Sequence, residues 1–232
     1  MDRRINTAQG IYFNNVSVDG VYYNNEHIWP TASAEASPDP WSPSTDITTV
    51  AWIDASDSSN YTRSGTSLLS VTDKAGTYTM SIGGNPSTNN STQNGLNVFD
   101  FDGNGDYIRV ASTSDFGFGT STDFTLEAWI YPTTTTGDRA LFDFRTSSSG
   151  NVTFFIDAAT GKLAIWNGAK HGSTGTVVSA NQWHHVAFVR SGSTTTAYLD
   201  GSVDFTTTSS FDFGTSRPLG IGGTPIPTGS YF

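Results

Sequence analysis

Residues 124–131 read Phe-Thr-Leu-Glu-Ala-Trp-Ile-Tyr, and Pro132 follows them directly. Apolar residues recur at every second position, which is the period at which side chains of an extended strand return to the same face of a sheet. Proline has no backbone N–H to donate to a neighbouring strand, so it marks the end of the segment. The stretch therefore predicts a strand in which Glu127 shares a face with Thr125 and Trp129.

Further short strands follow along the chain. Residues 152–156 and 162–166 flank Asp157-Ala158-Ala159-Thr160-Gly161, which predicts a hairpin with Gly161 at a positive φ. The other predicted strands are residues 140–144, 183–190 and 194–199, with turns at 191–193 and 200–201. Residues 83–97 are rich in Asn, Ser, Thr and Gly, and we predict a loop there. Short antiparallel strands joined by tight turns predict an all-β sandwich of two sheets.

Composition supports this fold class and excludes several functions. The chain has 232 residues but only 3 Glu and 2 Met, too few helix-forming residues for a helical bundle. No apolar run approaches the roughly 20 residues that span a bilayer, so we expect no membrane insertion. The net charge of −10 argues against a nucleic-acid partner. The absence of Cys excludes disulfides and thiol nucleophiles, and the N-terminus shows no signal peptide.

The first 30 residues contain a short repeat. Ile11-Tyr12-Phe13-Asn14-Asn15 is echoed by Val21-Tyr22-Tyr23-Asn24-Asn25, and Asp19-Gly20 between them predicts a hairpin turn. Two short strands are marginally stable alone, so the ribbon is expected either to pack on its own domain or to dock to an assembly. The candidate docking residues are Ile11, Tyr12, Phe13, Val21, Tyr22, Tyr23 and Trp29. We predict a β-ribbon over 1–30, a Pro-rich linker over 31–46 and the sandwich over 47–232.

Three segments carry a resemblance to a known family. Residues 99–108, Phe-Asp-Phe-Asp-Gly-Asn-Gly-Asp-Tyr-Ile, are followed by 124–130 and then by Trp-His-His-Val-Ala-Phe-Val-Arg at 183–190 with Tyr-Leu-Asp-Gly at 198–201. In this order and spacing they resemble the laminin-G-like, concanavalin-A-like jelly rolls over residues 50–232. The resemblance implies a jelly-roll β-sandwich of two antiparallel sheets, binding of glycans or proteins, and in some members a Ca²⁺ site. The family's closing strand has no counterpart before Phe232; the strand is absent, the chain continues, or another segment fills its place.

The repeat ending in Ile28-Trp29-Pro30 resembles leaders of tailed-bacteriophage structural proteins. This resemblance implies a non-enzymatic virion protein, a tail fibre, spike or capsid decoration, located in the virion. Its expected partners are other virion proteins, further copies of itself and host-surface glycans. The alternative is a stand-alone carbohydrate-binding lectin that is extracellular.

The candidate ligands for a metal are few. Asp102 and Asp106 lie in a Gly-Asn loop whose oxygens could bind Ca²⁺ or could accept hydrogen bonds from backbone amides in a tight turn. No other cofactor is expected. His184 and His185 are adjacent on a predicted strand and point to opposite faces, so they do not form a shared zinc site.

The acidic residues argue against glycoside hydrolysis, which on this fold needs a pair of carboxylates. Glu127 is the only Glu on a predicted strand, and its same-face neighbours Thr125 and Trp129 supply no second carboxylate. We therefore predict a protein that is not an enzyme. Trp129, Trp166 and Trp183 are expected either to stack on sugars or to pack in the core, with core packing the more common use. For Trp183 we predict packing at the edge of the sandwich.

Overall fold

The computed structural model describes residues 12–13, 16–17, 21–23, 26–29, 49–90, 96–147 and 152–223. The chain forms two compact units, Met1–Thr48 and Thr49–Phe232. The described helices are two short 3₁₀ turns, η1 (Ser58–Asn60) and η2 (Ser114–Phe116). Among the described residues, no helix has the length and apolar character to cross a membrane.

The first unit contains two small hairpins. Strand β1 (Tyr12–Phe13) pairs with β2 (Val16–Ser17), and β3 (Val21–Tyr23) pairs with β4 (Glu26–Trp29). The prediction of one hairpin turning at Asp19-Gly20 was therefore wrong, because each copy of the repeat pairs with the residues directly after it. Phe13 is paired with Val16, a separation that allows the shortest antiparallel connection. Asp19-Gly20, Ile11 and the predicted linker over 31–46 lie outside the described residues, as do residues 224–232, where the closing strand was sought.

The second unit is an all-β sandwich of two antiparallel sheets, as the sequence predicted. The large sheet runs in the order β15-β14-β13-β12-β19-β10-β7-β6-β8-β9, with β5 also paired to β6. Its strands are β5 (Tyr61–Ser64), β6 (Ser67–Thr72), β7 (Thr79–Gly83), β8 (Ser87–Asn90), β9 (Asn97–Asp100), β10 (Tyr107–Thr113), β12 (Arg139–Asp143), β13 (Thr153–Ile156), β14 (Lys162–Trp166), β15 (Lys170–Val177) and β19 (Arg217–Ile221). Strand β8 falls inside the predicted loop 83–97. Its residues are all polar, so they show no apolar–polar alternation, and the strand forms through its pairing with β9.

The small sheet has the order β11-β16-β17-β18. Its strands are β11 (Phe124–Ile130), β16 (His184–Ser191), β17 (Thr194–Leu199) and β18 (Ser202–Thr207). Leu199 pairs with Ser202 across Asp200 and Gly201, whose φ values of 51° and 77° fit a two-residue hairpin turn. The predicted positive φ at Gly161, between β13 and β14, is confirmed at 68°. These turns keep the strands antiparallel and in register.

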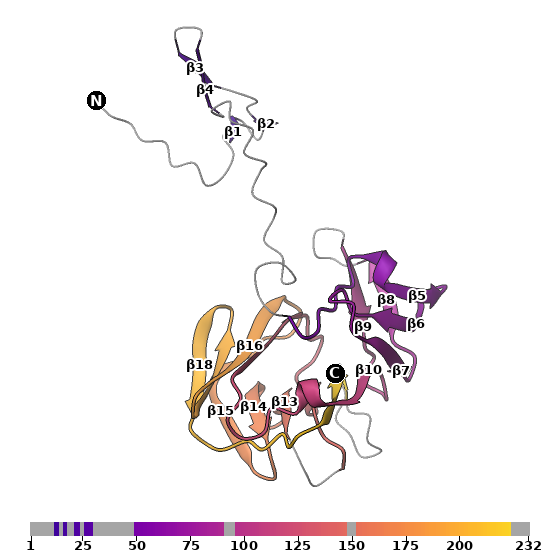
Figure 1. Ribbon diagram of the computed structural model, residues 1–232, viewed down its shortest axis with the longest axis vertical. Coiled ribbons are helices and arrows are strands. Elements are labelled where there is room, and N and C mark those ends of the chain that lie inside the picture. Colours follow the sequence, from indigo (N-terminus) through magenta and orange to yellow (C-terminus); the bar gives the residue numbers. More distant parts are fainter. Residues whose placement is uncertain are drawn as a thin grey trace, which may run out of the picture. The chain divides into compact units, whose positions relative to one another are not determined.

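The space between the sheets is filled mainly by phenylalanine rings. Phe118, Phe144 and Phe213 contact one another with centroid distances of 5.1–5.9 Å, mostly edge to face. Phe154 joins this cluster and contacts Phe188 of β16 at a centroid distance of 4.7 Å with the rings tilted, so it connects the large sheet with the small one. Strands β15 and β18 lie side by side and close one margin of the sandwich (Figure 1). There Phe205 packs on Gly172, where any side chain would collide with its ring.

A buried arginine connects the small sheet to two loops. Arg190 of β16 is 3% exposed. Its guanidinium donates hydrogen bonds to four backbone carbonyl oxygens, those of Phe118, Gly119, Thr122 and Phe211, at 2.6–3.3 Å. The guanidinium carbon also lies 4.9 Å from the Phe124 ring centroid and 5.4 Å from that of Phe213. The loop before β11 and the segment after β18 are thus held on the end of the same strand.

We predict that Arg190→Lys lowers the free energy of unfolding by about 2–4 kcal/mol, because an ammonium cannot reach four diverging carbonyls and leaves buried acceptors unpaired. Thermal and urea denaturation measure the loss. Arg63→Lys, at an exposed position on β5, is the matched control and should be neutral. Equal stability of the two variants would contradict the role given to Arg190.

Candidate functional site

The outward face of the small sheet carries the most exposed aromatic side chain among the described large apolar residues. Along β11, Phe124 and Ile130 are buried, whereas Thr125, Glu127 and Trp129 are exposed. The alternation predicted from the sequence is confirmed, and it places these three side chains on one face. Trp129 is 65% exposed, so its indole contributes little to the core. For this residue the structure favours the alternative in which the ring is available to a ligand.

Neighbouring strands extend the patch. Trp129 is paired with His185 of β16, and their ring centroids are 5.3 Å apart. His185 Nε2 lies 3.6 Å from Glu127 Oε2. Two residues farther along the sheet from the Trp129–His185 pair, Tyr198 of β17 is paired with Val203 of β18, which is 61% exposed. We call this surface the Trp129 face, defined by Thr125, Glu127, Trp129, His185, Tyr198 and Val203.

The opposite side of the same strand fixes the position of His185. His184 points inward and is 4% exposed, so the prediction that the two histidines face opposite ways is confirmed. Its Nδ1 lies 2.8 Å from Asp200 Oδ2, and Asp200 Oδ1 accepts the backbone N–H of His185 at 2.9 Å. Burial alone would raise the pKa of Asp200, but the hydrogen bonds from His184 and His185 outweigh it and hold that pKa below its ordinary value. Asp200 therefore ties the hairpin turn to the strand behind the Trp129 face.

The structure also brings together a Ser-His-Asp row that the sequence did not reveal. His184 Nε2 lies 3.1 Å from both the hydroxyl and the carbonyl oxygen of Ser179. A catalytic histidine has to keep Nε2 available to its serine hydroxyl, and the imidazole has to be within reach of a substrate. Here the carbonyl shares that nitrogen and the imidazole is buried. The row anchors the turn at Ser179 rather than presenting a nucleophile.

The two predicted calcium ligands are engaged with backbone amides. Asp106 is 1% exposed; its Oδ1 accepts from the Asn85 N–H at 2.7 Å and its Oδ2 from the Asp102 N–H at 3.0 Å. Asp102 Oδ1 accepts from the Asn104 N–H at 2.7 Å. Within the described ranges, no group of three or more His, Asp or Glu side chains is arranged to hold a metal ion. These contacts are those of the hydrogen-bonded-turn alternative, and the calcium alternative for Asp102 and Asp106 stays to be tested by chelation.

The remaining predicted residues differ in how well they can be placed. Trp166 and Trp183 are half-buried. Trp183 packs against Tyr131 with a centroid distance of 5.6 Å, and its buried Nε1 has no hydrogen-bond partner among the described residues. This arrangement is that of a packing residue, as predicted for Trp183. The docking residues of the first unit lie on or beside strands β1, β3 and β4, apart from Ile11, and the described structure does not extend to their side chains.

Comparisons with known proteins identify the fold. Residues 102–232 match the family model of the concanavalin A-like lectin/glucanases superfamily. Among solved structures, domain 4 of AbnA, a GH43 extracellular arabinanase from Geobacillus stearothermophilus in complex with arabinotriose, is similar with a TM-score of 0.52 and 18% identity, over 65% of this chain and 76% of that one. The carbohydrate-binding module CBM66 from Bacillus subtilis aligns with a TM-score of 0.39 and 19% identity, over 61% of this chain and 86% of that one. No curated protein sequence matches the chain. At these identities, the first structural likeness concerns the fold alone.

We predict that chelation with EDTA leaves the melting temperature unchanged, because backbone N–H groups already satisfy Asp106. The variant Asp106→Asn should cost about 1–3 kcal/mol, since its amide would turn an N–H toward a backbone donor. Differential scanning calorimetry with EDTA, with added CaCl₂ and on the variant measures both effects. A melting temperature that falls with EDTA and recovers with CaCl₂ would establish the calcium site instead.

Proposed function

The chain belongs to the concanavalin A-like lectin/glucanases superfamily, and from this premise we propose that its sandwich binds carbohydrate on the Trp129 face. The single observation that carries the proposal is the outward indole of Trp129, which is 65% exposed on β11, an outer strand of the small sheet. Tryptophan is enriched at binding interfaces, because its large ring buries much apolar area when a ligand covers it.

The chemistry around the indole suits a sugar. A pyranose or furanose ring has an apolar C–H face that stacks on an aromatic ring, and a rim of hydroxyls that need hydrogen-bond partners. Trp129 offers the stacking surface, and Glu127 and His185 stand beside it with an acceptor and an imidazole 3.6 Å apart. The backbone N–H of His185 is bonded to Asp200, which fixes the strand beneath the face, and the imidazole itself lies against Trp129 with ring centroids 5.3 Å apart.

The shape of the face favours a chain over a single sugar. Neighbouring strands are about 4.8 Å apart, so the four strands present a surface roughly 14 Å wide. The polar row of Thr125 and Thr196 continues the surface beyond Trp129 and Tyr198. We infer that the ligand is a stretch of several sugar residues lying across the strands. The arabinanase domain of similar fold was solved with arabinotriose, a ligand of this kind.

We further propose that binding occurs without hydrolysis. Cleavage by the usual mechanism needs two carboxyl groups on either side of the scissile bond, about 5–9 Å apart. On β11 the same-face neighbours of Glu127 are Thr125 and Trp129, and across the strand pair it faces Ala187. A lone carboxylate can accept sugar hydroxyls but cannot supply both the acid and the nucleophile or base.

We predict that Trp129→Ala abolishes retention on the polysaccharides that the parent protein binds, at least a tenfold loss of affinity, or about 1.4 kcal/mol. Stability should change by less than about 0.5 kcal/mol, since the removed side chain is largely in water. Affinity electrophoresis in gels that contain arabinan, xylan or β-glucan measures binding, and thermal denaturation measures stability.

The control is Leu69→Ala on β6, which removes another exposed apolar side chain, 57% exposed, from the large sheet. It should bind like the parent. The proposal is refuted if Trp129→Ala binds as tightly as Leu69→Ala in a gel that retards the parent protein.

A second candidate function follows from the first unit. We propose that the sandwich is displayed on a virion, with residues 1–30 docking to other virion proteins and bringing several copies together, and that it attaches to host-surface glycans. The supporting observation is that the strands of residues 12–29 pair among themselves, in a unit separate from the sandwich. The alternative location is extracellular, as a free lectin.

Deletion of residues 1–40 should leave a folded sandwich with unchanged melting temperature, because the described core residues, including the partly buried ones packed against them, begin at Ala51. The truncated protein should no longer co-sediment with particles assembled in the same cells. Sucrose-gradient sedimentation of particles from complemented lysates provides the readout. Normal incorporation of the truncated protein would rule out the docking role.

A further inference from the structure

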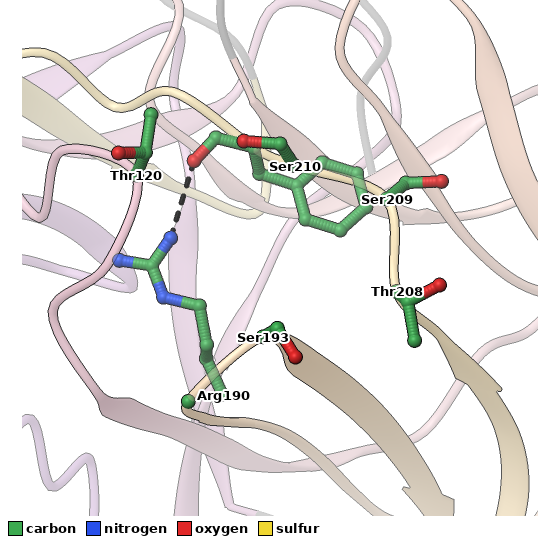
Figure 2. A pocket seen from close by; sticks show the side chains of 8 residues that line it. Thr120, Arg190, Ser193, Thr208, Ser209 and Ser210 are labelled. Carbon is green, nitrogen blue, oxygen red and sulfur yellow. Dashed lines mark hydrogen bonds between the residues drawn. The ribbon is translucent and has the colours of Figure 1, made fainter.

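A small pocket lies at the end of the small sheet away from Trp129. It is a cavity of about 80 Å³ between the β16–β17 turn, the loop before β11 and the segment after β18. Figure 2 shows Arg190 extending toward Thr120 and the segment at Ser210, with Ser193 and Thr208 along the other side. His185, beside Trp129, and Arg190, at the pocket, are five residues apart on β16, which places them roughly 17 Å apart along the strand.

The positive charge of Arg190 has no anionic partner in contact. All four of its hydrogen bonds go to carbonyl oxygens, which satisfy the N–H groups but carry no net charge. Within the described residues no carboxylate forms an ion pair with it. Burial lowers the pKa of Arg190, and the charge of Asp123 opposes that effect. Buried charges in proteins are almost always paired, so a buried guanidinium that forms no ion pair among the described residues and lies beside a cavity points to an anion from outside.

The walls of the pocket fit such an anion. Five residues with hydroxyl side chains line it, Thr120, Ser193, Thr208, Ser209 and Ser210, and none of its lining residues is acidic. The Ser209 hydroxyl lies 3.0 Å from His171 Nδ1, so the other four are the candidates for a ligand. Asp123 stays outside the lining; it is exposed, and its Oδ1 accepts the Gly192 N–H at 2.8 Å. The four bonds of Arg190 leave one of the five guanidinium N–H groups for a ligand. Hydroxyls can donate to a carboxylate and can also accept from sugar hydroxyls, whereas a carboxylate wall would repel the ligand.

We propose that this pocket binds the carboxylate of an acidic sugar, a uronic acid unit at a chain end. The inference rests on the proposed carbohydrate function and adds a second, charge-selective contact to it. The cavity admits a carboxylate and the edge of one ring but not a chain passing through, so it would select termini. The Trp129 face would bind the neutral stretch of a polysaccharide, and the pocket would bind its acidic end.

The test is a titration of the full chain with D-galacturonate, D-galactose and acetate, followed by backbone amide chemical shifts. Galacturonate should shift the amides of Gly192, Ser193 and Thr208–Ser210, and galactose should bind at least tenfold more weakly. Raising the salt concentration should weaken galacturonate binding, because the contact is with a charge. Acetate, which lacks the ring, should also bind at least tenfold more weakly.

Two variants distinguish a failure of the pocket proposal from a failure of the proposed binding on the Trp129 face. Thr208→Val removes a pocket hydroxyl at constant shape and should weaken galacturonate binding several-fold with unchanged folding. Trp129→Ala should leave galacturonate binding intact, whatever it does to polysaccharide retention. Equal affinity for galactose and galacturonate, or shifts away from the pocket, would overturn the proposal. Acetate binding as tightly as galacturonate would overturn the assignment to a sugar.

Discussion

The guanidinium of Arg190 is the contact on which the arrangement of the small sheet depends. Four carbonyl oxygens from two distant segments converge on it, and two phenylalanine rings cover it. These bonds fix the loop before β11 and the segment after β18 on β16, and β11 and β18 are the outer strands of that sheet. With β16 anchored at Arg190, the two-residue period of the strand turns His184 inward and His185 outward. The position of the Trp129 face follows from this register.

The aromatic residues serve two roles: those in the core stabilise the fold, and Trp129 on the surface is available for binding. Phe144, Phe154 and Phe188 are fully buried and connect the two sheets. Trp129 is 65% exposed, so most of its apolar surface stays in water and contributes little to the stability of the fold. Asp200 bonds the His184 imidazole and the His185 backbone N–H, so the hairpin turn that closes the sheet also fixes the backbone from which the outward imidazole projects. A rigid, pre-ordered surface of this type lowers the entropic cost of binding a flexible glycan.

Local patterns in the sequence were sufficient for the elements but not for their long-range contacts. The alternation over 124–131 predicted β11 and its outward Glu127 and Trp129, and the glycine at 161 predicted a hairpin turn. Strand β8 was missed because its residues are all polar. The N-terminal pairing was wrong because each copy of the repeat pairs with the residues directly after it and not with the other copy. The carbonyls around Arg190 lie up to 72 residues away in the chain, and Ser179, His184 and Asp200 meet only through the fold. The periodicity of a short stretch of sequence cannot predict contacts between residues so far apart in the chain.

The central claim is that glycans bind on the outward face of the small sheet. Mapping of backbone amide shifts, on the full chain titrated with an oligosaccharide cut from a polysaccharide that retards it in gels, tests this claim most directly. We expect the largest shifts along β11, β16 and β17 around Trp129, His185 and Tyr198, together with the indole N–H of Trp129. Shifts confined to the turn at Asp102–Asp106, with the amides of β11 unmoved, would contradict the account and move the binding site to the edge of the sandwich.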